Sequence, residues 1–281
     1  MGPFLYNTYW VVIFMRKVVD FDDVSYIKYG KFILNHLNFD INKGEFVSIV
    51  GGNGSGKSIL MDILAGFREY NGNIFINGTY LDRDNIFKIR SMIGLVMDDD
   101  MNIGGLVRDE LYFTLENLGY TQEKASLVVR KLALKFEIDD ILDISMERLS
   151  QSKRVVVMIV RALLNNPSIL FIDSCFSYLN DDDRALVIRV MEEYKKKRKM
   201  TVVLFSRNIR DILFVDKIMI LYKGEIVMRG TLRNILRQED NISRYGLDIP
   251  FCVKLSLALM DRGVINHIYL DEGKLVDMLW K

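Results

Sequence analysis

The sequence predicts an α/β fold with a largely parallel β-sheet covered by helices. Five apolar, strand-like runs alternate with segments of helical periodicity, at residues 46–50, 92–97, 168–173, 201–206 and 217–222. A glycine-rich loop also lies directly between the first of these runs and a helical segment, which is the strand–loop–helix order of a phosphate-binding unit. The chain has 281 residues and 50% of them are hydrophobic, which is enough for a sizeable core.

The loop at residues 51–58 reads Gly-Gly-Asn-Gly-Ser-Gly-Lys-Ser, an unbroken G-x-x-x-x-G-K-[ST] motif. Glycines let backbone N–H groups approach phosphate oxygens, and the following helix adds its positive end. Lys57 is expected to hold the β- and γ-phosphates, and the Ser58 hydroxyl is expected to coordinate Mg²⁺. The predicted phosphate-binding residues are Gly51, Gly52, Asn53, Gly54, Ser55, Gly56, Lys57 and Ser58. The motif predicts nucleoside triphosphate binding, whereas hydrolysis needs further residues.

Charge and composition exclude several classes of function. The 38 basic and 37 acidic side chains nearly cancel, so no nucleic-acid partner is expected. Two cysteines without metal-like spacing indicate a reducing compartment without disulfides. No run of about eighteen apolar residues is present, so the chain is not expected to span a membrane by itself. The basic run at residues 195–199 is interpreted as a solvated helix end rather than a lipid- or nucleic-acid-binding patch.

The first fourteen residues differ from the rest of the chain. They are aromatic and nearly uncharged, without the basic region of a signal peptide, and Tyr6 stands where a myristoylation motif has Ser or Thr. Met15 is followed by two basic residues and looks like a natural start. Residues 1–14 are interpreted as a loose extension or a misassigned start, and a short segment lying on a membrane surface is the alternative.

Helical patterns indicate two further parts of the chain. The stretch from about residue 98 to 157 is predicted to be a helical insertion, because apolar residues recur on one face at i+3 and i+4 spacing. These residues are Ala125, Val128, Leu132 and Phe136. After Gly230 the chain is expected to form a separate tail. There, Pro250 at the first helical position and Gly263 just past the end predict a helix.

A Mg-nucleotide site of this type needs a second acidic residue at the end of a neighbouring strand. The apolar run that begins at residue 168 ends at Asp173, which is therefore the candidate Mg²⁺ ligand beside Ser58. Upstream, residues 149–153 read Leu-Ser-Gln-Ser-Lys, followed by Arg-Ala-Leu and Pro167. This arrangement resembles the ATP-binding subunits of ABC transporters, whose signature Leu-Ser-Gly-Gly-Gln precedes Arg-Ala-Leu, proline and the Walker B strand. The resemblance implies a P-loop NTPase fold with a RecA-like core.

The tail narrows the resemblance. Residues 245–251 read Tyr-Gly-Leu-Asp-Ile-Pro-Phe and, with the helix after them, are similar to the C-terminal extension of energy-coupling factor ATPases, which energise vitamin and metal-ion uptake. The resemblance implies an ABC ATP-binding domain at 15–234, with its helical subdomain at about 98–157, and an α-rich extension at 235–281. It implies ATP and Mg²⁺ as ligands. Tyr29, or else Tyr26, corresponds to the aromatic residue that stacks on adenine.

The resemblance also implies partners and a location. The partners are a second ABC ATPase, an integral transmembrane component and a substrate-binding membrane component. The chain would lie on the cytoplasmic face of the cell membrane as a peripheral protein, and the membrane component would choose the substrate. The sequence itself leaves that substrate open.

Four positions depart from the catalytic pattern of this family. Ser174 replaces the glutamate that activates water, Asp98 replaces the Q-loop glutamine, Arg207 replaces the switch histidine and Asn180 replaces the D-loop aspartate. Serine is no base near neutral pH, and a missing general base costs ~10²–10⁴ in rate. Arginine keeps its proton, so Arg207 supplies a fixed positive charge instead of a proton shuttle. No catalytic residue of the usual set is therefore intact.

The signature also departs from the family pattern. Leu149 and Ser150 are retained, whereas Gln151 and Ser152 replace the two glycines and Lys153 replaces the glutamine. The glycines let the backbone approach a nucleotide across a dimer, so Gln151 and Ser152 are expected to carry side chains into that space. Ser150 keeps its hydroxyl and is expected to cap the following helix.

The losses favour one function and leave two alternatives. In this family each nucleotide lies between one subunit's phosphate loop and the other's signature, so a homodimer would carry both defects in both sites. We therefore expect a heterodimer with a more complete paralogue, in which this chain binds Mg-ATP, clamps the partner ATPase and hydrolyses weakly or not at all. The alternatives are an active ATPase with Asp98 as substitute base, or a non-transport ABC-type regulatory module. Asp98 and Arg207 would either form a salt bridge in the empty site or be two independent losses.

Overall fold

The computed structural model describes residues 17–97, 105–247, 249–269 and 272–280. Its larger sheet has six strands in the order β10-β9-β3-β8-β7-β6. The five strands that the sequence predicted pair in parallel, and β10 is added antiparallel at one edge. The bounds are β3 (Phe46–Val50), β6 (Ile93–Val96), β7 (Ile169–Ile172), β8 (Thr201–Ser206), β9 (Lys217–Tyr222) and β10 (Glu225–Thr231). The predicted α/β class is confirmed.

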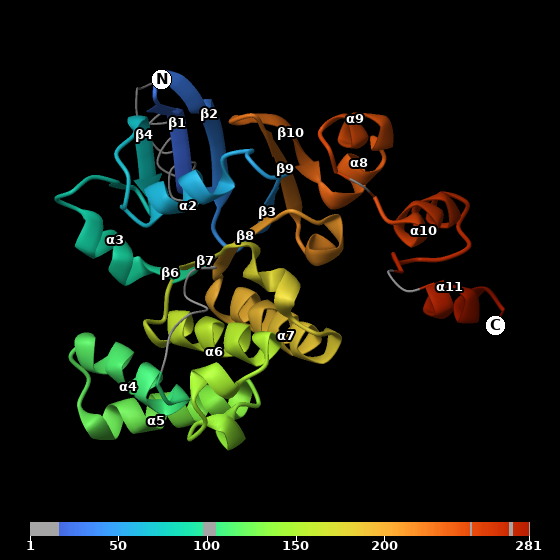
Figure 1. Ribbon diagram of the computed structural model, residues 1–281. Helices are drawn as coiled ribbons and strands as arrows, with labels where there is room; N and C mark the ends of the chain where they lie inside the picture. Colours follow the sequence, from blue (N-terminus) through green and yellow to red (C-terminus); the bar gives the residue numbers. More distant parts are fainter. Residues whose placement is uncertain (1–16, 98–104, 248, 270–271, 281) are drawn as a thin grey trace, which may run out of the picture.

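A second sheet is antiparallel and has the order β2-β1-β4-β5. Its strands are β1 (Lys17–Lys28), β2 (Lys31–Asn42), β4 (Asn71–Ile76) and β5 (Thr79–Tyr80). The hairpin between β1 and β2 turns at Tyr29 and Gly30, which both have positive φ. Helix α2 (Lys57–Leu64) lies between this sheet and the parallel sheet, and helix α3 (Ile86–Met92) leads from β5 into β6 (Figure 1).

The parallel sheet is buried on both faces, as expected for strands covered by other layers. Phe46 and Val50 of β3 point into a core shared with α4 to α7, whereas Val47 and Ile49 point into a core shared with α2 and the antiparallel sheet. Between them, the Ser48 hydroxyl is buried and donates to a backbone carbonyl of β8 at 2.9 Å, so its polarity is satisfied. The end of β3 is therefore a rigid base for the loop that follows it.

The helical segment between β6 and β7 contains α4 (Val107–Asn117), α5 (Gln122–Lys135) and α6 (Gln151–Leu164), which gather below the parallel sheet in Figure 1. Helix α7 (Asp181–Arg198) runs beside α6. The predicted face of α5 is confirmed: Ala125, Leu132 and Phe136 are buried, with Val128 partly buried against the same core. Helix α6 continues past residue 157 into the main core, so the limits of a helical subdomain stay a prediction.

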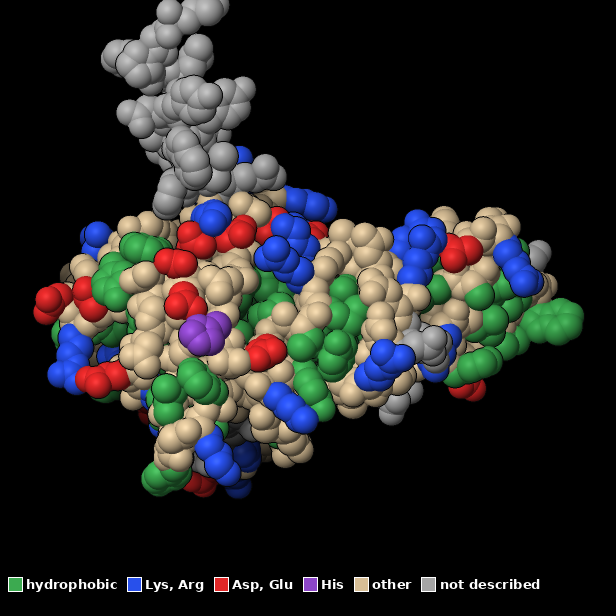
Figure 2. Space-filling view, turned by 90° about the horizontal axis from the view of Figure 1, so that it is seen from above, with side chains coloured by type: hydrophobic (Ala, Val, Ile, Leu, Met, Phe, Trp, Pro, Cys, Tyr) green, Lys and Arg blue, Asp and Glu red, His purple; other side chains and the backbone are tan. Residues whose placement is uncertain are grey.

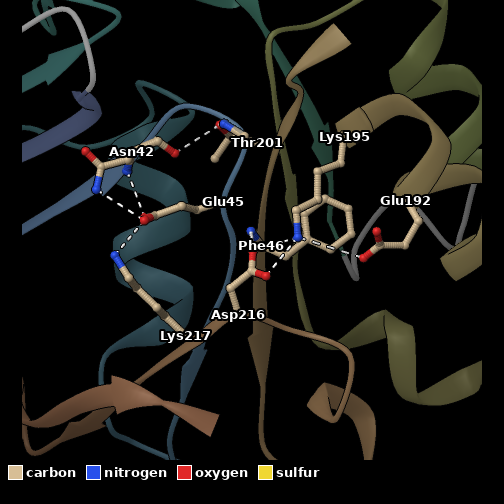
Figure 3. Close-up of polar contacts among 9 residues, drawn as sticks. Asn42, Glu45, Phe46, Glu192, Lys195, Thr201, Asp216 and Lys217 are labelled. Carbon is tan, nitrogen blue, oxygen red and sulfur yellow. Dashed lines mark hydrogen bonds and ion pairs between the residues drawn. The ribbon is translucent and has the colours of Figure 1, made fainter. Parts of the chain in front are cut away.

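Charged contacts hold the amino-terminal edge of the parallel sheet (Figure 3). Lys217 at the start of β9 pairs with Glu45 before β3 at 2.6 Å. Asp216 accepts the Phe46 N–H at 2.8 Å and pairs with Lys195 at 2.8 Å. The Lys195 ammonium also lies 4.6 Å from the centre of the Phe46 ring. The interpretation of the basic run as a solvated helix end is confirmed for residues 196–199, which are exposed at the end of α7. It is wrong for Lys195, because Asp216 and Phe46 bind it against the sheet.

The chain ends in four helices: α8 (Leu232–Leu236), α9 (Glu239–Arg244), α10 (Phe251–Asp261) and α11 (Glu272–Leu279). Pro250 is the N-cap of α10, so its predicted place at the first helical position is wrong by one residue. Gly263 has φ +71°, its N–H bonds to Met260 O, and the next N–H bonds to Leu259 O. This is a Schellman ending, and it confirms the predicted glycine stop.

The surface carries no broad region of one charge in the view of Figure 2, where basic and acidic side chains are interspersed. Hydrophobic side chains are exposed at the end formed by the last helices, including Phe251, Val276 and Trp280. Among the described residues, no helix combines the length and apolar character that crossing a membrane requires.

Candidate nucleotide-binding site

The glycine loop connects the carboxyl end of β3 to the start of α2. Its backbone approaches β8 and β9 closely: the Gly51 N–H bonds to Ser206 O at 3.1 Å, and a Cβ at Gly51 would lie 2.3 Å from Leu221 O. Gly56 caps α2 with φ +109°, which only glycine adopts without strain. The loop therefore directs the first N–H groups of α2 toward the space in front of it.

Lys57 folds back over the loop. Its ammonium donates to Gly51 O at 2.5 Å, to Gly52 O at 3.0 Å and to Ser55 Oγ at 3.1 Å. Burial, and after it the positive charge of Arg207, lowers the pKa of Lys57 from its usual 10.5 to about 8, while Asp173 acts in the opposite direction. A polyanion entering this site would stabilise the charged form of Lys57.

A cavity of about 580 Å³ opens in front of the loop. It is lined by Asn53 to Ser58, and also by three residues that the sequence associated with the site: Asp173, Ser174 and Arg207. The sequence did not predict the other lining residues, which are Lys28, Ile33, Ile59, Asp62 and Met97. Their positions depend on how the β1–β2 hairpin, α2 and β6 come together, and no local pattern marks them.

Asp173 and Ser58 fit the donor set that Mg²⁺ prefers, a carboxylate and a hydroxyl. Both line the cavity, Asp173 at the end of β7 and Ser58 in the first turn of α2. Oδ1 of Asp173 accepts the Ser174 N–H at 2.7 Å and its hydroxyl at 3.1 Å. Among the described residues, none donates a hydrogen bond to Oδ2.

Of the substituted catalytic positions Ser174, Arg207 and Asp98, the structure describes the first two. Ser174 lines the cavity, but its hydroxyl is used by Asp173. Arg207 also lines the cavity and donates to Asn53 Oδ1 at 3.3 Å. Asp98 lies outside the described residues, so its role as a substitute base and its salt bridge with Arg207 stay predictions.

The two tyrosines proposed for adenine stacking occupy different positions. Tyr26 accepts a hydrogen bond from Arg68 at 3.3 Å and lines another hollow with that residue. Tyr29 is 92% exposed in the β1–β2 turn, next to Lys28 of the cavity. Neither tyrosine is among the residues that line the cavity, so the choice between Tyr29 and Tyr26 stays a prediction.

The signature residues surround the start of α6. Ser150 is the N-cap and accepts the Lys153 N–H at 3.2 Å, which confirms the predicted cap. Leu149 is buried and Gln151 is exposed. The expectation that Ser152 carries its side chain into the nucleotide space is wrong. Ser152 is buried, and its hydroxyl bonds to Asp183 of α7, a partner 31 positions away that the sequence did not indicate.

The fold and the site together define a class. A glycine loop between β3 and α2, with an aspartate at the end of a nearby parallel strand, is the site of a P-loop NTPase. Comparisons narrow the class further. A family model described as ABC transporter matches residues 34–177, and one described as the C-terminal domain of the energy-coupling factor transporter EcfA1 matches residues 250–281.

Related proteins align with this chain over nearly its whole length. The energy-coupling factor transporter ATP-binding protein EcfA1 of Mesomycoplasma hyopneumoniae is 31% identical over 252 residues, 89% of this chain and 91% of that protein. The protein named EcfA of Enterococcus faecium is 31% identical over 274 residues, 95% and 98% of the two chains. This chain therefore belongs to the energy-coupling factor transporter ATP-binding proteins of the ABC family.

Solved structures share the fold. The structure of cbiO1 from Clostridium perfringens, described as part of the ABC transporter complex cbiONQ, has a TM-score of 0.73 at 22% identity and covers 88% of this chain and 99% of that one. A dimeric ATP-binding cassette, MJ0796, bound to ADP and Pi, has a TM-score of 0.68 at 25% identity and covers 76% and 98%. The observed fold is thus the ABC cassette that the sequence predicted.

Proposed function

We propose that this chain is a nucleotide-binding subunit of an energy-coupling factor importer for vitamins or metal ions. It binds Mg-ATP, clamps a partner ATPase and has weak or absent hydrolysis in its own site. One observation carries the proposal: residues 53–58 of the intact phosphate loop and Asp173 line the same cavity as Ser174, which takes the place of the general base. The cavity therefore has the groups that bind a nucleotide, but position 174 lacks a carboxylate that could act as general base.

The residues of the cavity have separable roles in this proposal. Lys57 and the N–H groups of the loop bind the phosphates, Ser58 and Asp173 hold Mg²⁺, and Tyr29 stacks on adenine. Bound Mg²⁺ supplies charge neutralisation on the phosphate oxygens. Arg207 adds a second cation, and its hydrogen bond to Asn53 holds that charge beside the phosphate loop in the lining of the cavity.

Weak hydrolysis follows from the chemistry of Ser174. Its hydroxyl donates to Asp173 at 3.1 Å, which fixes it as a support for the Mg²⁺ ligand. A serine hydroxyl does not take a proton from water near neutral pH, and a general base contributes ~10²–10⁴ in rate. Arg207 does not supply the missing step, since a guanidinium retains its proton.

The partners and the location belong to the same proposal. A second, more complete ABC ATPase would face this chain, with an integral transmembrane component and a substrate-binding membrane component beside them. The names of the relatives and the cbiONQ complex of the structural neighbour support this assembly. The chain would be peripheral on the cytoplasmic face of the membrane. The proposed domains are an ATP-binding domain at 15–234 and an extension at 235–281, after an N-terminal segment at 1–14.

Binding and turnover test the proposal. The purified chain is expected to bind Mg-ATP saturably with little turnover, and Lys57→Ala is expected to remove the binding. Pull-down through a tag on this chain, expressed with its neighbouring genes, is expected to recover a second ATPase and an integral membrane protein. Rapid turnover by the chain alone that Lys57→Ala abolishes would contradict weak or absent hydrolysis, and recovery of no membrane protein would favour a non-transport role.

A further inference from the structure

Two departures in the signature converge on one carboxylate. Ser152 donates its hydroxyl to Asp183 Oδ2 at 2.5 Å, and the Lys153 ammonium pairs with Asp183 Oδ1 at 2.9 Å. Ser152 and Asp183 are 6% and 4% exposed. A glycine at position 152 has no hydroxyl to offer, and a glutamine at 153 has no charge. The two substitutions thus complete a buried contact between the first turns of α6 and α7.

The same contact reaches the loop that follows Asp173. The Ser152 hydroxyl accepts the Asn180 N–H at 3.1 Å, so its oxygen is engaged on both sides. Asn180 in turn caps α7 by accepting the Asp183 N–H at 2.8 Å. The segment from Ser174 to Asn180 is therefore tied at one end to Asp173 and at the other end to the start of α6.

The signature residues differ in whether their side chains face inward or outward. Ser152 turns into the subunit, whereas Ser150 and Gln151 remain exposed at the N-terminus of α6. The lost glycine therefore does not place the side chain of Ser152 over that terminus. A charge-balanced pair of Lys153 and Asp183 holds the turn in this orientation, and Lys153 remains one-third exposed at its side chain.

We propose that Ser152, Lys153 and Asp183 form a clasp that positions the signature segment, residues 149–153, against a phosphate held by the partner subunit. The inference rests on the proposed heterodimer. These three are positioning residues: they orient the start of α6 and the segment before α7 as one body, and none of them needs to touch the nucleotide. This chain would then contribute a preorganised half to the partner's site, even though its own site lacks a base.

Hydrogen exchange on the chain alone tests the clasp. Asp183→Asn removes the charge that binds Lys153, and Asp182→Asn is the matched control because Asp182 is an exposed carboxylate in the same helical turn. Asp183→Asn is expected to speed amide exchange about tenfold in both residues 149–154 and 177–182, and the control to change neither. Ser152→Gly is expected to have the same paired effect. Faster exchange confined to α7, or equal effects of Asp182→Asn and Asp183→Asn, would overturn the clasp.

Turnover by the complex tests the positioning role. Asp183→Asn is expected to lower kcat about ten- to a hundredfold with little change in KM, since a misplaced group acts on the reaction more than on binding. In the double variant, Lys153→Gln removes the positive charge that Asp183→Asn leaves without its carboxylate. The double variant is therefore expected to recover part of the lost kcat. Mg-ATP binding by the isolated variant should stay unchanged. An unaltered kcat, or a loss that only parallels the folded fraction, would overturn the role.

The two proposals fail in different ways. A complex that forms and turns over ATP, but is indifferent to Asp183→Asn, contradicts the positioning role alone. A wild-type complex without turnover contradicts both the proposed function and the positioning role, and the exchange experiment then decides on the clasp itself.

Discussion

Nucleotide binding by this chain is expected to weaken as the pH rises above about 8, because Lys57 then loses its proton. The pKa of this lysine in the empty site is lowered from 10.5 to about 8, first by burial and next by the charge of Arg207. Bound phosphates place negative charge beside the ammonium and raise its pKa again. Binding at alkaline pH therefore requires the uptake of a proton.

The size of the effect follows from the two pKa values. If phosphates restore the Lys57 pKa to its usual 10.5, the free site is mostly protonated at about pH 7 and mostly neutral at about pH 9. The dissociation constant for Mg-ATP is then about tenfold larger at about pH 9 than at about pH 7, and it rises about tenfold for each further pH unit until it approaches the upper pKa.

The assay is a titration with a fluorescent ATP analogue across this pH range. Arg207→Gln removes a charge that lowers the Lys57 pKa, so the break in the profile is expected to move to higher pH. Arg237→Gln is the matched control, because Arg237 is an exposed arginine that pairs with Asp261 in the C-terminal helices. A flat wild-type profile between about pH 7 and pH 9, or a break that Arg207→Gln leaves in place, would refute this reasoning.

Three further predictions concern single residues. Ser174→Glu, tested in a complex whose partner ATPase is inactive, is expected to raise turnover by less than about 10²-fold, because Arg207 still replaces the histidine; no increase would show that the base is not what is missing. Gly51→Ala is expected to abolish the rise in Tm that Mg-ATP causes, because its Cβ would lie 2.3 Å from Leu221 O; an undiminished rise would contradict this. Gly263→Ala is expected to cost about 1 kcal/mol in urea unfolding, from its φ of +71° alone, since among the described residues only the chain neighbours of Gly263 come within 4 Å of the added Cβ; an unchanged midpoint would contradict it.

The parallel sheet could be predicted because its strands are short apolar runs that are buried on both faces. The antiparallel sheet was not singled out from the sequence. Strand β1 carries Asp20, Asp22 and Asp23 among its apolar residues, and its pairing with β2 shifts register several times. Such irregularity hides the alternation that marks a strand.

The phosphate loop, Asp173, Ser174 and Arg207 could be placed in one site because each follows a strand of the same parallel sheet. Residues 53–58 of the loop line one cavity together with Asp173, Ser174 and Arg207. Ser152 could not be placed in the same way. Its orientation depends on Asp183, which lies on another helix, and a motif compared position by position does not contain that partner. The mistake at Pro250 is of another kind, since helix ends shift by a residue at little cost.

The central claim is that this chain binds Mg-ATP without turning it over efficiently. The most direct test measures binding and single-turnover hydrolysis on the same preparation of the isolated chain, with Lys57→Ala as control. Saturable binding that is lost in Lys57→Ala, with hydrolysis no faster than in that variant, is the predicted result. Rapid hydrolysis that requires Lys57, or no binding of Mg-ATP at all, would contradict the account.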